Sequence, residues 1–137
     1  MDRGFDYFEH TADVGIRAWG PTLEDAFAAA AEGLVAYMVD VSEAREVGEA
    51  AVEVEGESDE RRLHRFLEEV LYLFETRRWV VTSVRVALDG DRLTATLRGE
   101  AYDAARHGHV HEVKAVTFHD LAVRRAPAPE VRVIVDI

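Results

Sequence analysis

The change in hydrophobic spacing near residue 79 is the feature that most constrains how this chain can fold. Before it, apolar residues recur at the i, i+3, i+4, i+7 spacing of one helix face. These residues are Leu63, Phe66, Leu67, Val70, Leu71 and Phe74. After it, apolar and polar residues alternate from Val80 to Leu88 and from Leu93 to Leu97, with Asp89-Gly90-Asp91 between the two runs. The pattern predicts a long helix followed by a β-hairpin.

Further elements are predicted on both sides of this unit. Gly20-Pro21-Thr22 ends one strand and begins a first helix that reaches about Tyr37, with Thr22 as the N-cap and Asp25 placed to reach back to it. The second helix opens at Gly56-Glu57-Ser58-Asp59. Strands are predicted at 4–9, 14–19, 46–55, 113–117, 121–125 and 130–136.

These elements predict a fold of the α+β class. We expect two helices packed on one face of a largely antiparallel or mixed β-sheet, because each element must bury its apolar side against another. A length of 137 residues suits one hydrophobic core. We therefore expect a single domain that covers residues 1–137.

The composition argues against two classes of partner. The formal net charge is −11 and no basic cluster is visible, so direct binding to nucleic acid is not expected. No apolar run approaches the roughly 20 residues that a membrane span needs. The chain opens without an export signal and contains no cysteine. These features predict a soluble, cytoplasmic protein. We also expect a monomer, although none of these features determines the oligomeric state.

One segment concentrates negative charge. Between Glu43 and Glu60, eight carboxylates accompany a single arginine, Arg45. Such a segment is either a solvated face that favours solubility or a patch that steers the protein toward a basic partner. An enzyme with an RNA-binding surface is one such partner.

Lys114 is the only lysine among sixteen basic residues, the other fifteen being arginine. An ammonium is a compact charge on a flexible stem, whereas a guanidinium is planar, so a position that keeps lysine in this composition is a candidate functional site. The alternative is that Lys114 and His119 lie on a strand edge and face solvent.

Two acids near opposite ends of the chain form a second candidate site. Asp13 precedes an apolar strand, and Asp136 ends the last strand next to Ile137, which adds the α-carboxylate. If these strands are neighbours, three anionic groups converge and need a cation. Oxygen ligands suit a hard divalent ion such as Ca²⁺ or Mg²⁺. Alternatively, Asp13 is a turn residue and the C-terminus is frayed.

Three histidines alternate near the predicted hairpin. On an extended segment His107, His109 and His111 would share one side, an arrangement that can bind Zn²⁺. Gly108 and the charged neighbours favour instead an exposed loop that binds nothing, and we assign His109 and His111 no role.

Several motifs, distributed over almost the whole chain, resemble those of the archease family. They are His10-Thr11-Ala12-Asp13-Val14-Gly15-Ile16, Gly99-Glu100, Arg106-His107, Val113-Lys114-Ala115-Val116-Thr117-Phe118-His119 and Val135-Asp136-Ile137. The resemblance implies an activator of the RtcB-type RNA-splicing ligase. Such a protein is not an enzyme itself but promotes guanylylation and repeated turnover of the ligase in tRNA splicing and RNA repair.

The resemblance also implies roles for particular residues. A divalent cation, usually Ca²⁺ with Mg²⁺ or Mn²⁺ as alternatives, would bind at Asp13, Asp136 and Ile137. Lys114 corresponds to the family's functional lysine. Phe118 stands where the family often has tyrosine.

Two other functions remain as alternatives. One is a small metal-dependent hydrolase that uses His10, His107, His119 and Asp13 around a transition metal. The other is a general chaperone-like binding module with a structural cation. The bound metal separates them, because several histidine ligands favour the hydrolase and oxygen ligands favour the activator.

Overall fold

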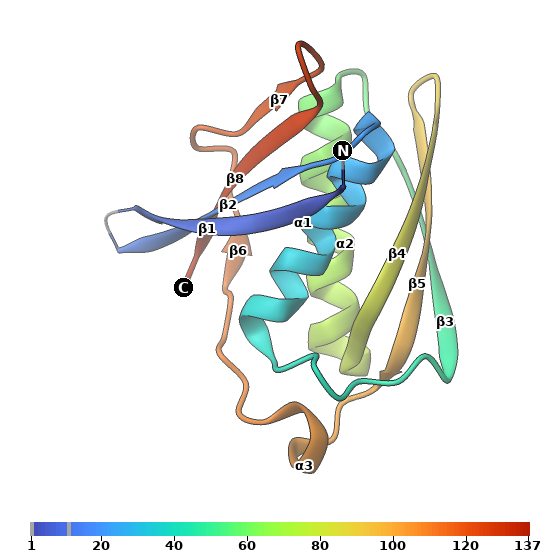
Figure 1. Cartoon of the computed structure of the whole chain (residues 1–137), viewed down its shortest axis with the longest axis vertical. Coiled ribbons are helices and arrows are strands. Elements are labelled where there is room, and N and C mark those ends of the chain that lie inside the picture. The colour runs from blue at the N-terminus through green and yellow to red at the C-terminus, as the bar shows by residue number, and fades with distance from the viewer. Residues whose placement is uncertain (1, 11) are drawn as a thin grey trace.

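The computed structural model describes residues 2–10 and 12–137 and divides their strands between two sheets (Figure 1). In chain order the elements are β1 (Gly4–His10), β2 (Asp13–Trp19), α1 (Leu23–Met38), β3 (Gly48–Glu55), α2 (Asp59–Arg77), β4 (Trp79–Asp89), β5 (Arg92–Ala101), α3 (Ala104–His107), β6 (Ala115–Val116), β7 (Ala122–Arg124) and β8 (Glu130–Asp136). The first sheet has the order β1–β2–β8–β6, with β7 also paired to β8, and the second has the order β3–β5–β4.

The two long helices form a middle layer between these sheets (Figure 1). α1 contacts β2 of the first sheet and β4 of the second, and α2 contacts β6 and β3. The α+β class is confirmed, and the strand pairs are antiparallel. The strands make two sheets instead of the single sheet expected. Alternation in a sequence shows which side of a strand is buried, but it does not show which strands are neighbours.

The composition of α1 explains how a helix can be covered on both sides. Every residue from Ala26 to Ala31 is completely buried, and all but Phe27 are alanine. At Gly33, a Cβ atom would lie 3.0 Å from the Phe5 ring and 3.3 Å from Ile16. These small residues allow the strands of both sheets to approach the helix closely.

Both long helices begin where the sequence predicts. Thr22 caps α1, since its hydroxyl oxygen accepts a hydrogen bond from the Asp25 amide at 3.1 Å and donates to the Asp25 carboxylate at 2.8 Å. Ser58 caps α2 by accepting from the Arg61 amide at 3.1 Å. Each such cap contributes about 1 kcal/mol to helix stability. No helix in the described part of the chain is long and apolar enough to cross a membrane.

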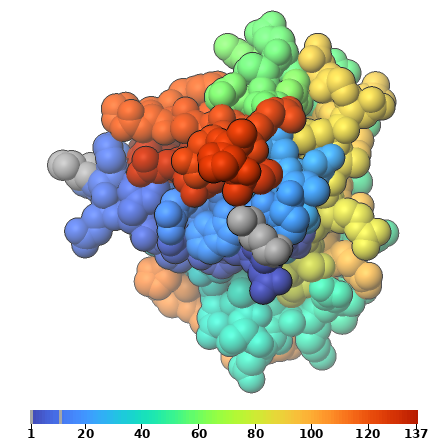
Figure 2. Space-filling view, turned by 45° about the horizontal axis from the view of Figure 1, so that its top comes forward, coloured from blue at the N-terminus to red at the C-terminus, as the bar shows by residue number. Residues whose placement is uncertain are grey.

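The segment before the last strand differs from its prediction. β8 matches 130–136, but β6 and β7 are shorter than expected, and α3 forms where a loop was expected. β6 pairs with the C-terminal end of β8, whereas β7 pairs with its N-terminal end. The chain must therefore leave the sheet between Val116 and Ala122. Figure 2 shows these C-terminal segments beside the N-terminal strands on one side of the molecule.

Candidate functional site

Strand β8 brings together residues from the beginning, middle and end of the chain. Asp136 is the register partner of Asp13 in β2 and of Ala115 in β6. The Lys114 amide donates a hydrogen bond to the Asp136 carbonyl oxygen at 2.7 Å. Directly opposed residues of antiparallel strands carry their side chains on the same face, with Cβ atoms about 4.5–5.5 Å apart. The convergence of Asp13 and Asp136, which the sequence left conditional, is therefore present.

These two acids lie on the face of the first sheet that is turned away from the helices. Ile16 and Val135 are part of the buried core, so the alternation of side chains places Asp13 and Asp136 on the opposite face. Gly15 lies two residues after Asp13 in β2 and is the register partner of Phe8 in β1. A Cβ atom at Gly15 would come within 2.1 Å of the Phe8 ring. Glycine is required at this position because the Phe8 ring lies across the strand.

The carboxylate oxygens on this face are suited to bind a hard cation. Within residues 2–10 and 12–137, no lysine or arginine side chain lies at ion-pair distance from either carboxylate, and the only basic side chain near them is His10, whose Nδ1 lies 3.7 Å from Asp13. Ile137, which follows Asp136, is 38% exposed. Like charges that face each other without a cation repel, and carboxylate oxygens are ligands that Ca²⁺ and Mg²⁺ prefer.

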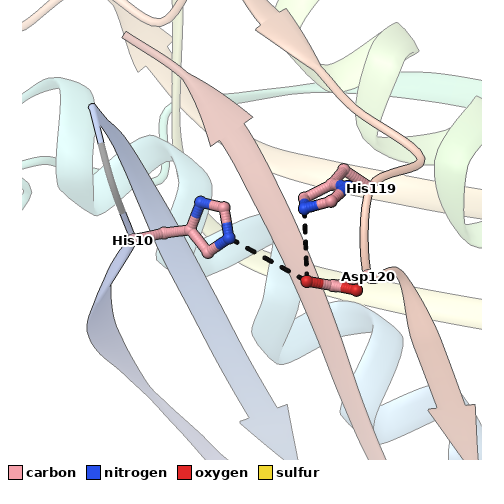
Figure 3. A group of neighbouring side chains, drawn as sticks. All are labelled: His10, His119 and Asp120. Atoms are coloured by element: carbon pink, nitrogen blue, oxygen red, sulfur yellow. Dashed lines mark ion pairs between the residues drawn. The ribbon is translucent and has the colours of Figure 1, made fainter.

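A second group of donors lies beside the acidic pair (Figure 3). His10 ends β1, and its Nε2 lies 3.9 Å from the Asp120 carboxylate. His119 Nε2 lies 3.3 Å from the same oxygen. Sequence reasoning named both histidines but missed Asp120, whose position next to His119 was the only signal. Thr11, which belongs to the same motif as His10, lies outside the described residues.

Lys114 is exposed and immediately precedes β6. The hydrogen bond from its amide to Asp136 fixes the Lys114 backbone beside the acidic pair. The side chain is exposed to solvent. The proposed role of this ammonium stays a prediction.

His107 does not lie in this site, and the expectation that it is exposed is wrong. It is fully buried, and its Nε2 contacts the Glu100 carboxylate at 2.9 Å. Its Nδ1 accepts a hydrogen bond from the Asp103 amide at 2.9 Å, so Nε2 carries the proton that Glu100 accepts. α3 ends at His107 and Gly108 has a φ of 71°, so the chain is not extended and the three histidines do not share one side.

The buried acid beside His107 is fully partnered. Glu100, which is 3% exposed, also accepts hydrogen bonds from the Arg45 amide at 2.9 Å and from the Arg106 guanidinium at 3.0 Å. Burial alone would raise its pKa, but the hydrogen bonds from Arg45, His107 and Arg106 outweigh burial and lower the pKa to about 2. We call the buried pair Glu100 and His107, together with the Arg106 guanidinium and the Arg45 amide that bind Glu100, the buried node.

The buried node attaches the segment before Lys114 to the end of α1. The Asp40 amide donates to the His107 carbonyl oxygen at 2.9 Å, and the His111 amide donates to that of Met38 at 2.8 Å. At the neighbouring Gly99, a Cβ atom would lie 1.9 Å from the Val80 carbonyl oxygen. The residues of the motifs at 99–100 and 106–107 therefore stabilise the fold and do not form an exposed reactive site.

Comparison with known proteins identifies the family. A model of the Archease protein family matches residues 5–137. The chain belongs to this family. Curated relatives named Protein archease include one from Thermococcus gammatolerans, 45% identical over 131 residues that cover 91% of each chain. Another, from Danio rerio, is 34% identical over 141 residues that cover all of this chain and 87% of the relative.

Solved archease structures share the fold. The solution structure of Methanobacterium thermoautotrophicum protein 1598 has a TM-score of 0.82 and 32% identity, and covers 98% of this chain and 99% of that one. The crystal structure of a Thermotoga maritima archease, described as a possible chaperone, has a TM-score of 0.60 and 18% identity, with 95% and 94% covered. The second likeness concerns the fold alone. The resemblance that the sequence motifs suggested is thus confirmed.

The position of His107 also bears on the alternative of a metal-dependent hydrolase. His10, His119 and Asp13 lie close together in this archease, but His107 belongs to the buried node. The four-residue site that this alternative required is therefore not formed.

The acidic segment is less negative than its sequence suggests. Arginines from other elements approach it: Arg92 lies 3.4 Å from Glu53, and Arg125 contacts Asp59 at 2.8 Å. Arg98 lies 3.7 Å from Glu46. The segment contains β3, an edge strand of the second sheet, and a role in steering a partner remains a prediction.

Proposed function

We propose that this archease activates an RtcB-type RNA ligase, and that it promotes guanylylation and multiple turnover of the ligase in tRNA splicing and RNA repair. One observation supports this role above the others: Asp136 has Asp13 on one side and the Lys114 backbone on the other, on the outer face of the first sheet. Membership of the archease family supports the same role, because these residues belong to the motifs that define the resemblance.

The proposed cation is Ca²⁺, with Mg²⁺ or Mn²⁺ as alternatives. Asp13, Asp136 and the α-carboxylate of Ile137 would hold it through oxygen atoms. A bound divalent ion would neutralise the facing carboxylates and hold the last residues of β8 against β2. That ordering matters for activation because Lys114 is hydrogen-bonded to the same end of β8.

Lys114 is the residue that we expect to act on the ligase. An exposed ammonium on a fixed backbone can reach into a partner, and ammonium groups bind phosphate oxygens well. In guanylylation the negative charge develops on the phosphates of the nucleotide, so a positive charge placed there would assist the step. The net charge of −11 is consistent with a protein that leaves RNA binding to its partner.

Two substitutions at Lys114 test this proposal. In a guanylylation assay with a purified RtcB-type ligase and labelled GTP, Lys114→Ala should nearly abolish stimulation while thermal stability is unchanged. Lys114→Arg keeps the charge but replaces the compact ammonium, so stimulation should be only partly retained. Arg85→Ala removes one exposed positive charge from the opposite sheet and should stimulate normally. Full stimulation by both Lys114 variants would contradict the proposal.

A further inference from the structure

We propose that His10, His119 and Asp120 form a binding site for a transition metal ion of the Zn²⁺ class, separate from the oxygen-only site at Asp13 and Asp136. The three side chains converge from the end of β1 and from the loop after β6, and both imidazole rings face the Asp120 carboxylate (Figure 3). Two imidazoles and one carboxylate are typical ligands of Zn²⁺, whereas Ca²⁺ prefers oxygen atoms alone.

One distance between ligand atoms matches a tetrahedral site, and the others are longer. Bonds of about 2.0–2.1 Å to zinc place neighbouring ligand atoms about 3.3–3.5 Å apart. His119 Nε2 is 3.3 Å from the Asp120 carboxylate oxygen, and His10 Nε2 is 3.9 Å from that oxygen. The ligand atoms of the whole group lie within 4.8 Å of one another, so small side-chain rotations bring all of them to bonding distance.

The other nitrogen of His10 supplies an independent observation. His10 Nδ1 is buried and has no hydrogen-bond partner among the described residues, which is rare for a buried polar atom. The Asp13 carboxylate faces it at 3.7 Å. A metal-bound histidine almost always donates its second N–H to a carboxylate or carbonyl group. Metal bound at Nε2 would place the proton on Nδ1 and draw it to Asp13, which accounts for the unsatisfied atom.

The loop that carries the other two ligands is held in place by the sheet. The Thr117 hydroxyl donates to the Ile134 carbonyl oxygen at 2.9 Å and accepts from the His119 amide at 3.2 Å. Asp120 has a φ of 52°, in the left-handed region that aspartate and asparagine tolerate better than most residues. The backbone of this loop is thus held in place, and the exposed side chains of His119 and Asp120 need only rotate toward an ion.

The exposure of the site leaves room for an outside ligand. The side chains of His119 and Asp120 are 63% and 69% exposed. A site with three protein ligands and one open position can hold water or a group from another molecule. His109 and His111 also lie near each other, with ring centroids 5.8 Å apart, and they are exposed. This pair offers only two ligands and is the natural control.

Metal binding to the chain without a polyhistidine tag tests this proposal independently of the ligase. We expect one Zn²⁺ per chain by calorimetry, and Co²⁺ should give the visible absorption of a low-coordinate site. His119→Ala and Asp120→Asn should each weaken Zn²⁺ binding about tenfold or more, since the loss of a ligand should cost at least as much as the loss of an outer-shell partner. Asparagine at residue 120 keeps the left-handed backbone accessible. His109→Ala should leave both signals unchanged.

Three outcomes would overturn the proposal. Zn²⁺ binding that is insensitive to His119→Ala would exclude this site. A loss of binding in His109→Ala would assign the metal to the His109 and His111 pair. Displacement of Co²⁺ by excess Ca²⁺ would show one shared site at the acidic pair instead of two separate sites. Retention of the Co²⁺ spectrum in Ca²⁺ is the expected result.

Discussion

Two groups of acids and histidines in this archease are built from the same side chains but differ in how they are satisfied. In the buried node, Glu100 accepts hydrogen bonds from His107, from Arg106 and from the Arg45 amide. On the outer face of the first sheet, Asp13 and Asp136 face each other, and His10 Nδ1 has no partner among the described residues.

The difference separates a structural role from a binding role. A buried polar group with all its hydrogen bonds made stabilises the fold, and its removal leaves its partners unsatisfied. Groups that repel each other or lack partners lower stability until a ligand satisfies them, and such groups persist where function needs them. The comparison therefore predicts opposite consequences for the loss of a side chain in the two groups.

The largest effect is expected from His107→Ala. The substitution creates a cavity, removes the hydrogen bond from His107 to Glu100 and leaves the Asp103 amide without its acceptor, so the free energy of unfolding should fall by about 3 kcal/mol. Urea denaturation would measure this change. His109→Ala, an exposed histidine two residues away, should change it by less than about 0.5 kcal/mol. Equal effects of the two variants would contradict the structural role of the buried node.

The acidic pair should respond in the opposite direction. Ca²⁺ at a concentration of about 100 times its Kd should stabilise the parent by about 2.7 kcal/mol, and Asp13→Asn or Asp136→Asn should remove most of this gain. Without the ion, Asp136→Asn should be at least as stable as the parent, because the charge facing Asp13 is gone. Thermal melts with and without Ca²⁺ measure both effects.

Two outcomes of these melts would break the comparison. A melt of the parent that neither Ca²⁺ nor Mg²⁺ changes would count against a cation at the acidic pair. A loss of stability in ion-free Asp136→Asn as large as that in His107→Ala would show that the acidic pair is structural too.

A smaller effect is expected in acid. Burial disfavours the charge of Glu100, but its hydrogen bonds lower its pKa to about 2, from the ordinary value of 4.5 for a glutamate. A carboxylate with a lowered pKa in the folded state stabilises the protein above its unfolded pKa, and this contribution is lost as the pH falls through the folded value. Unfolding free energy should therefore decline between about pH 4.5 and 2, and less steeply in Glu100→Gln. Glu43→Gln, at an exposed position, should follow the parent.

Local patterns were enough to predict most of the elements. The spacing of Leu63 to Phe74 predicted α2, and the alternation after Val80 predicted the hairpin of β4 and β5. These predictions succeed because a helix face and a strand face each repeat within a few residues, so the signal lies entirely inside the element. The caps at Thr22 and Ser58 are equally local, since each hydroxyl binds an amide three residues later.

The candidate site was predicted only in part. Asp13, Lys114, Asp136 and Ile137 stood out by residue type and position, but their convergence depended on which strands are neighbours. Asp120 gave little signal by itself, because its relation to His10 arises only when the loop after β6 folds over the end of β1.

The sequence by itself determined the periodic elements, their caps and the residue types available for chemistry. Only the tertiary structure decided that the strands form two sheets, that β8 lies between β2 and β6, and that His107 points into the core. The physical reason is that strand pairing and burial depend on contacts between residues far apart in the chain. The spacing of neighbouring residues in the sequence does not show which of these contacts form.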